Sequence, residues 1–588
     1  MADTAAPADA VSVAQAYHQR TKHRLDGYAA SPDTLDWDAQ PDPFRRYLGA
    51  PLTALPLKAD TLAMGWADLF TPGRIAPRPL DRDALGLLFE LSFALSAWKQ
   101  YGPDRWAMRV NPSSGNLHPT EAWLVCQGVV GVADGVHHYA PREHALEQRA
   151  AFSPSPASDA AHATGTPPHA CIALTSIQWR EAWKYGERAF RYCQLDVGHA
   201  IGALRYAAAV LGWRLRPVAC STEQLAALLG LDRDADFGAA EREEPDALFE
   251  LLPQDMAEQD NGPRDWHVPT TDWRGVPNRL DRHPMYRWPV IDTVAAATRV
   301  PASPSETPRS LSASAFCSVS PARYAGSSFT CAERTGAQAP GRTTQDLPFL
   351  PRSTQAATTL IRQRRSAQRF DVRARMPLDQ LWLLLRALHP ARLPFDAWPT
   401  EPRVHVLLFA HRVDGLAPGA YLLPRSAVGC GLLRHSLSAA LELLPVPDAP
   451  SDAPLLRLAE NPALAGTLRT LNCHQALGSD AMLGFALLAE FNPLPDAAAY
   501  RERLQEAGLI GQVLYLEAEG LQLRGTGIGC FFDDALHQLI GLSEFAAANA
   551  PLQSVYHFTV GLPLIDTRIA TEPPYAHLSP NPEGTLDV

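Results

Sequence analysis

The sequence predicts a mixed helix-and-strand fold made of two similar halves. At 588 residues the chain is too long for one hydrophobic core. A stretch rich in Pro, Ser and Gly interrupts it near the middle, and the same sequence patterns occur in the same order on both sides. We therefore expect a first domain at residues 1–290, a linker at 291–345 and a second domain at 346–588.

The predicted linker carries almost no apolar periodicity. Its segments 301–308, 310–314 and 326–328 consist mainly of Pro, Ser and Gly. Such a stretch cannot bury enough apolar surface to offset the entropy lost on ordering, so we expect it to be mobile.

The elements on either side of the linker recur in order. In the first half, a helical segment at about 81–101 precedes an apolar strand at 122–126, and a long helix follows from Gly198. Small residues on one face of this helix and of its counterpart at Gly508 predict close helix packing. Two unrelated domains are the alternative. The matching patterns are Pro-Leu-Asp at 79–81 and 377–379, Pro-Thr-Glu at 119–121 and 399–401, Tyr with Pro-Arg at 138–142 and 420–425, and the two long helices.

The amino-acid composition argues against nucleic acid and membranes as partners. Hydrophobic residues make up 46% of the chain and charged residues 20%, which is typical of a soluble globular protein. The net charge of −11 argues against nucleic acid as the main partner. The first residues are acidic, and neither a signal sequence nor a run of apolar residues long enough to span a membrane follows. We expect a cytoplasmic protein.

The nine cysteines have no Cys-x-x-Cys spacing, and the histidines show no metal-ligand spacing. We therefore expect buried or incidental thiols, no disulfide framework and no metal site.

One loop carries the clearest chemical signal. Residues 111–119 read Asn-Pro-Ser-Ser-Gly-Asn-Leu-His-Pro and precede the predicted strand. Two hydroxyls, exposed backbone N–H groups and a carboxamide in one turn suit the edge of a planar ring rich in nitrogen and carbonyl groups. An ordinary loop is the alternative. The candidate ring-binding residues are Pro112, Ser113, Ser114, Gly115 and Asn116.

This loop resembles the flavin-contacting loop of the FMN-dependent nitroreductase superfamily, in particular its SagB-type (thiazoline/oxazoline dehydrogenase) branch. The resemblance implies an α+β fold with a mostly antiparallel sheet flanked by helices. Members normally act as homodimers with two FMN sites at the interface, so a repeat on one chain implies an intramolecular pseudo-dimer. In the family, one subunit supplies the ring loop, and the other supplies an Arg-x-Ser segment at the phosphate and a Gly-containing loop.

The second half carries the phosphate elements. Two guanidiniums and a hydroxyl at Arg364, Arg365 and Ser366 suit a phosphate, although a basic surface patch is the alternative. The family's third basic position falls on Gln368, with Arg369 one residue later. The glycine loop follows at 524–530, where Gly527, Ile528 and Gly529 are the candidate contacts.

The halves complement each other. The first half has Trp-Ala-Asp at 66–68 in place of the phosphate segment and no glycines at 215–219, while the second half has no ring loop at 392–396. Because the family joins these parts from different subunits, we expect one complete FMN site and one decayed site per chain.

Lys184 and Tyr185 are the candidate catalytic residues. They resemble the Lys-Tyr segment of the SagB-type branch, which is linked to proton transfer during azoline oxidation. Burial by Trp183 and Tyr185 would lower the pKa of the amine, so that it could act as a base. The alternative is a surface ion network of Lys184 with Glu187, and of Arg188 with Glu181. Near the C-terminus, Arg568 is a further candidate for the phosphate, or it pairs with Asp566.

We accordingly predict an FMN-dependent oxidoreductase that oxidises a small molecule or modified peptide by proton abstraction and hydride transfer to FMN. One alternative is a nitro or quinone reductase that takes electrons from NAD(P)H. The other is a flavin-free binding or scaffold protein in a peptide-modifying complex.

Overall fold

The computed structural model describes residues 9–152, 167–255, 266–267, 272–301, 310–311, 353–398, 400–437, 441–542 and 550–578. Every structural statement below concerns these residues. Most of the predicted linker, at 302–309 and 312–345, lies outside them.

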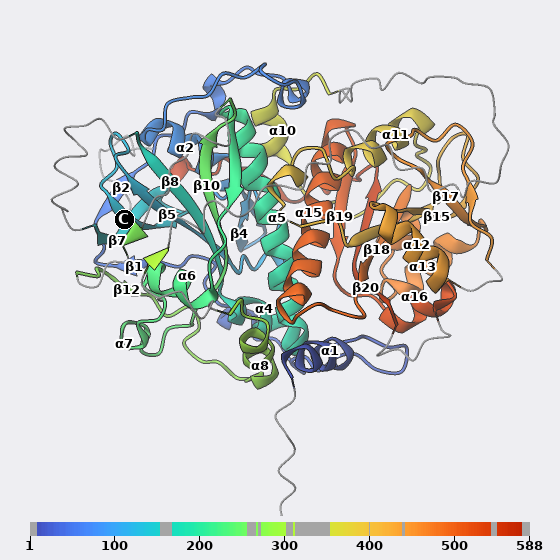
Figure 1. Ribbon diagram of the computed structural model, residues 1–588, viewed down its shortest axis with the longest axis horizontal. Helices are drawn as coiled ribbons and strands as arrows, with labels where there is room; N and C mark the ends of the chain where they lie inside the picture. Colours follow the sequence, from blue (N-terminus) through green and yellow to red (C-terminus); the bar gives the residue numbers. More distant parts are fainter. Residues whose placement is uncertain are drawn as a thin grey trace, which may run out of the picture.

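Two seven-stranded antiparallel sheets lie on opposite sides of a central pair of helices (Figure 1). The strand orders are β2-β7-β6-β5-β8-β10-β9 and β16-β17-β15-β14-β18-β20-β19. Six strands of each sheet correspond in order along the chain and across the sheet, so the repeated sequence patterns reflect a repeated topology. The first-half strands are β2 (Leu52–Ala54), β5 (Thr120–Gln127), β6 (Gly135–Ala140), β7 (Ala145–Ala151), β8 (His169–Ser176), β9 (Trp213–Pro217) and β10 (Glu244–Pro253). The second-half strands are β14 (Val404–Ala410), β15 (Gly419–Leu423), β16 (Leu444–Pro445), β17 (Leu456–Glu460), β18 (Leu483–Glu490), β19 (Arg524–Ile528) and β20 (Leu552–Gly561).

Further helices pack against the two sheets and against the central helix pair. In the first half these are α1 (Ala10–Arg20), α2 (Arg82–Glu90), α4 (Gln178–Tyr185), α6 (Thr222–Leu229), α7 (Asp234–Phe237) and α8 (Pro289–Ala297). In the second half they are α10 (Ala357–Gln363), α11 (Leu378–Ala387), α12 (Ala427–Ser436), α13 (Leu464–Leu471), α14 (Leu477–Asp480) and α16 (Asp533–Leu539).

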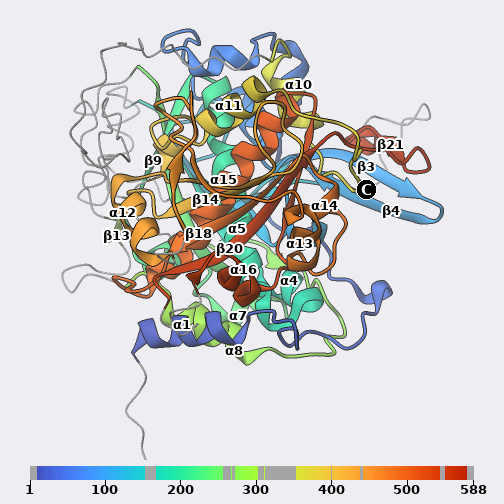
Figure 2. The same cartoon turned by 90° about the vertical axis from the view of Figure 1, so that its right-hand side faces the viewer.

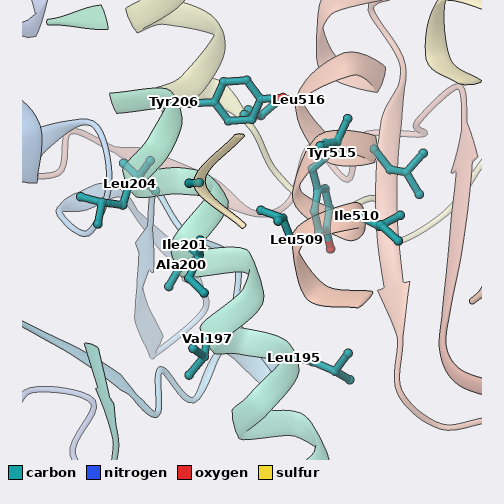
Figure 3. Packing of buried hydrophobic residues seen from close by; sticks show 14 of the residues in the cluster. Leu195, Val197, Ala200, Ile201, Leu204, Tyr206, Leu509, Ile510, Tyr515 and Leu516 are labelled. Carbon is teal, nitrogen blue, oxygen red and sulfur yellow. The ribbon is translucent and has the colours of Figure 1, made fainter. Parts of the chain in front are cut away.

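The long helices α5 (Ala189–Val210) and α15 (Ala498–Gly520) form the interface between the halves. Buried apolar side chains of both helices pack between the sheets (Figure 3). A Cβ on Gly198 would clash with the Gln505 carbonyl, and one on Gly508 would clash with the Leu195 carbonyl. The prediction of close packing through small residues is therefore confirmed.

The helix predicted at 81–101 is wrong beyond residue 90. The chain turns after α2 and forms the hairpin of β3 (Leu95–Tyr101) and β4 (Asp104–Arg109). Strand pairing outweighs the local helical pattern here, because Leu95 and Ala97 are buried while alternate residues are more exposed. The hairpin projects from the body of the molecule (Figure 2).

Segments near both ends of the described chain contact the opposite half of the molecule. Strand β21 (Ala570–Glu572), near the C-terminus, pairs with β3 of the first half, and the Tyr575 hydroxyl accepts a hydrogen bond from the Leu95 N–H at 2.9 Å. At the other end, the α1 residue His18 contacts the Tyr500 hydroxyl of α15 at 3.2 Å. Helix α8 continues the ordered first half past the predicted boundary at 290.

A disulfide joins Cys473 and Cys530, which corrects the expectation that the cysteines are all thiols. The two cysteines are 57 positions apart in the sequence, and the pairing could not be predicted because it depends on the tertiary structure. None of the helices in the described ranges combines the length and apolarity that crossing a bilayer requires.

Candidate functional site

A cavity of about 540 Å³ opens between the two halves. Its walls come from the 111–118 loop, the β3–β4 hairpin, α5, α15, β19 and the segment after α10. Predicted site residues from both halves therefore line one cavity. They are Pro112, Ser113, Ser114, Gly115, Asn116, Tyr185, Arg364, Arg365, Ser366, Gln368, Gly527, Ile528 and Gly529.

Arg364 and Arg365 line this cavity and are held in place by backbone carbonyls. Arg364 Nε donates to the Val110 carbonyl at 3.2 Å, and Arg365 Nη2 donates to the Ser96 carbonyl at 2.9 Å. Both carbonyls belong to the first half, so the arginines cross the interface. In the part of the chain that the structure describes, neither guanidinium forms an ion pair with a carboxylate. Their charges are therefore available to an anion.

Two further cations, Lys99 and Arg524, line the same cavity. Burial, together with Arg364 and Arg524, lowers the pKa of Arg365 to about 10, and burial with Arg365 and Arg524 lowers the pKa of Lys99. All four of these cations line the same cavity. Arg524 forms an ion pair with Glu519 at 3.8 Å, which offsets only part of this charge. An anion with several acceptor oxygens would relieve the repulsion.

Gly527 of β19 and Gly529, which follows that strand, both line the cavity and leave room for aromatic side chains. A Cβ on Gly527 would clash with the Tyr556 side chain, and one on Gly529 would clash with the ring of Tyr192. The glycines thus admit aromatic side chains, which themselves line the cavity beside the strand. The Gly527 N–H donates to the Tyr515 hydroxyl at 3.0 Å, and that hydroxyl lies 2.8 Å from Ser366 Oγ.

Asp196 on α5 anchors the 111–118 loop. Its carboxylate accepts hydrogen bonds from Ser114 N at 3.0 Å and from Ser114 Oγ at 2.9 Å. Burial raises the pKa of Asp196 to about 7, although hydrogen bonds from the loop oppose the shift. Asn116 Nδ2 fixes the other end of the turn by donating to the Ala107 carbonyl at 2.9 Å.

Lys184 and Tyr185 lie directly against this loop. A Cβ added at Gly115 would lie 2.5 Å from the Tyr185 hydroxyl oxygen and 3.2 Å from Lys184 Nζ. Lys184 Nζ is 5.3 Å from the ring centroids of both Trp37 and Tyr185, and burial lowers the pKa of the amine despite the opposing charge of Glu181. Tyr185 lines the cavity, whereas Lys184 is not among the lining residues.

The ion network considered for this segment is wrong. Glu187 pairs with Arg20 at 2.6 Å, and Arg188 pairs with Asp533 at 3.2 Å. Both carboxylate oxygens of Glu181 are buried without a hydrogen-bond partner among the described residues. Lys184 is therefore not neutralised by the predicted surface pairs.

Arg568 and Arg369 lie outside the cavity lining. Arg568 is a surface residue whose guanidinium pairs with Asp566 at 2.6 Å, which was the alternative considered for it. Only Thr567 lies between these two partners in the sequence, so the pair is a local one. Arg568 is not among the residues we assign to the site.

The equivalent place on the other side of the α5–α15 interface is filled by side chains. Trp66, in the position of Arg364, is fully buried, and its Nε1 donates to Glu517 at 3.2 Å. Its ring lies 5.1 Å from that of Tyr206. Arg205 binds Asp396, in the place of the ring loop, with both Nε and Nη2. These contacts leave bulky side chains where the first site has its cavity.

Several lining residues were missed by sequence reasoning. Asp196 is the one acid in helix α5, and the repeat aligns it with Glu506, which accepts from the Arg403 N–H at 2.9 Å. That pair of buried acids was the one available signal. Other lining residues outside the predicted set include Lys99, Trp106, Asn111, His118, Tyr192, Gln475, Tyr515, Arg524, Cys530 and Tyr556.

We expect Asp196→Asn to lower the free energy of unfolding by about 1–3 kcal/mol at acidic pH, the range for disturbing a buried hydrogen-bonded group. The folded pKa of Asp196 is raised to about 7 from the ordinary value of 3.8. Its contribution to stability is therefore complete below about pH 4 and lost as the pH rises through about 7. Urea unfolding of both proteins from pH 4 to 8 measures the difference, and parallel pH profiles would contradict the assignment.

Comparisons with known proteins show which folds resemble this one. A protein of Methanocaldococcus jannaschii, whose name assigns it provisionally to the nitroreductases, is 31% identical over 130 residues. The match covers 21% of this chain and 64% of that relative, which is less than two thirds of its length. No sequence-family model matches the chain.

A crystal structure from Anabaena variabilis, likewise named provisionally as a nitroreductase, matches over nearly the whole chain. It is 20% identical, covers 94% of this chain and 99% of its own, and superimposes with a TM-score of 0.62. The fold is therefore nitroreductase-like and α+β, with two domains.

The donor set of the cavity fits FMN. Lys99, Arg364, Arg365 and Arg524 provide the charge that a phosphate requires. The buried Oδ1 of Asn111, in the cavity wall, has no hydrogen-bond partner among the described residues, so a polar ligand would satisfy it. No group of three His, Cys, Asp or Glu side chains in the described ranges is arranged to hold a metal ion.

Proposed function

We propose that this protein is a flavin-dependent oxidoreductase that binds one FMN in the cavity between its halves. The observation that carries the proposal is the meeting of the 112–116 loop of the first half with Arg364, Arg365 and β19 of the second half at one cavity. Each half alone lacks part of that set. The nitroreductase-like fold supports the proposal without defining the reaction.

In this proposal the two ends of the cavity have different tasks. Arg364, Arg365, Lys99 and Arg524 hold the phosphate, and Ser366 and Gln368 lie beside it. Ser113, Ser114, Gly115 and Asn116 provide backbone and side-chain polar groups to the ring. Bound FMN supplies a two-electron acceptor.

The finer proposal is a SagB-type dehydrogenase that oxidises an azoline to an azole. This reaction removes a proton from one ring carbon and a hydride from its neighbour, so it needs a base. Lys184 can take the proton because its amine is partly buried, has a lowered pKa and lies against Gly115. The buried Tyr185 hydroxyl, which lines the cavity, is placed to donate a hydrogen bond to the substrate.

The cofactor spectrum tests the proposal. We expect the purified protein to be yellow and to show the absorbance of bound flavin. Flavin that is bleached rapidly by NADPH without oxygen would favour a nitro or quinone reductase over the dehydrogenase. A colourless protein that takes up no added FMN would contradict the flavoenzyme proposal.

We expect one FMN per chain, because Trp66 and the Arg205–Asp396 pair fill the second position. Protein saturated with FMN and then desalted should release one equivalent of flavin on denaturation, measured by absorbance against protein concentration. Two equivalents would refute the composite site. The Trp66→Ala variant is the matched test of the filled position: it should still release one equivalent, because the cations are missing there.

A further inference from the structure

The disulfide between Cys473 and Cys530 lies in the wall of the cavity. Cys530 follows Gly529 and lines the cavity, as does Gln475, two residues after Cys473. The Cα atoms are 6.0 Å apart, within the usual range for a disulfide. Both cysteines are partly exposed, so a thiol reagent can reach the bond.

The bond joins the turn between α13 and α14 to the end of β19. Two hydrogen bonds also connect these segments: Gln475 Nε2 to the Cys530 carbonyl at 3.4 Å, and Phe532 N to the Leu471 carbonyl at 2.8 Å. The first is long and flanks the cavity, and the second lies behind it. The disulfide adds a covalent connection to these hydrogen bonds and to the contact of the His474 and Phe532 rings, whose centroids are 5.7 Å apart.

The turn holds an unfavourable backbone conformation. Cys473 and His474 have φ angles of 52° and 61°, in the left-handed region that non-glycine residues rarely adopt. Two consecutive residues of this kind tend to relax when nothing holds them. Breaking the disulfide would therefore release a strained turn that carries the cavity-lining Gln475.

We propose that Cys473–Cys530 is a redox-sensitive site that keeps this wall of the cavity in its flavin-binding form. The inference rests on the proposed function for the identity of the ligand. A dithiol reduces the bond by thiol–disulfide exchange: the S–S bond breaks, two cysteine thiols form, and the dithiol becomes a disulfide. The turn then leaves its left-handed conformation, and Gln475 and Gly529 lose their fixed separation. The reduced protein binds FMN more weakly than the oxidised protein.

The test compares FMN affinity in the two redox states. Apoprotein is prepared oxidised, or reduced with dithiothreitol, and titrated with FMN while flavin fluorescence is followed. We expect the dissociation constant to rise about tenfold on reduction, as when the binding form falls to about one tenth of the population. Differential alkylation and mass spectrometry report the state of each cysteine in the same samples.

Variants separate this bond from the other cysteines, since Cys430 is also disulfide-bonded. Cys473→Ser should bind FMN weakly with or without dithiothreitol. Cys126→Ser is the matched control, because Cys126 is buried on β5 outside the cavity lining and should respond as the wild type does. If Cys473→Ser fails to fold, the oxidised and reduced wild-type proteins still give the comparison.

The outcomes are distinct. Alkylation of both Cys473 and Cys530 in protein that was never reduced would overturn the assignment of the bond. Equal dissociation constants in both states would overturn the coupling and leave the flavin proposal intact. Absence of FMN binding in both states would overturn the coupling together with the proposed function.

Discussion

Arg364→Ala should weaken FMN binding by about 2–3 kcal/mol, the range for losing a hydrogen bond to a charged group and leaving a phosphate partly unpaired. The guanidinium is buried against the Tyr515 ring, 4.9 Å from its centroid, and makes no ion pair within the described ranges. No carboxylate among the described residues therefore competes with the phosphate for the Arg364 charge. Titration of apoprotein with FMN, by fluorescence quenching, measures the effect.

Arg362→Ala is the matched control for this variant. Arg362 is two residues away, pairs with Asp60 and Glu90, and does not line the cavity. It should leave the FMN dissociation constant unchanged. Asp68→Ala, in the first-half segment that corresponds to the phosphate clamp, should also leave it unchanged. Equal losses in Arg364→Ala and Arg362→Ala would mean that the phosphate lies elsewhere.

Because the Arg364 side chain also binds the Val110 carbonyl across the interface, its loss could disturb the packing of the halves. Arg364→Lys distinguishes the two effects. It retains a positive charge but not the planar fork, so it should recover part of the affinity. The unfolding midpoint of each variant shows whether a loss of affinity reflects a loss of structure.

The two-half organisation could be predicted because repetition is visible at the level of short local patterns. Pro-Leu-Asp before a helix and glycines in a long helix mark the same structural places twice, and the two sheets have matching strand orders. The meeting of Ser114 with Arg364 in one cavity could likewise be anticipated, because each half lacks what the other has.

The contacts that connect distant segments could not be predicted. Asp196 binds Ser114 across 82 residues, Cys473 bonds to Cys530, and β21 pairs with the β3–β4 hairpin from the far end of the chain. None of these leaves a periodic signal, because each depends on how the halves pack. Arg568 shows a local contact that the sequence did offer: its guanidinium pairs with Asp566, two positions away, which was the alternative considered for it.

Lys184→Ala should leave FMN binding near normal and reduce turnover about 10²–10⁴-fold, the usual effect of removing a positioned acid or base. Lys184 Nζ contacts the ring loop near Gly115 but does not line the cavity, so the amine is close to the reacting end without holding the cofactor. Azoline-containing peptides are the first substrates to try, followed by nitroaromatics and quinones with NADPH.

The pH dependence gives this prediction a second measurement. Burial lowers the pKa of Lys184, so the neutral amine should be available at a lower pH than for an exposed lysine. In the wild type, kcat/KM should rise with pH until the amine is neutral, and Lys184→Ala should lack that limb. Lys58→Ala, which removes a surface lysine paired with Asp83, is the control and should keep it. Loss of flavin from Lys184→Ala would assign the residue a structural role. Full activity of that variant on a true substrate would refute the proton-transfer role, and the proposed flavin site would be unaffected.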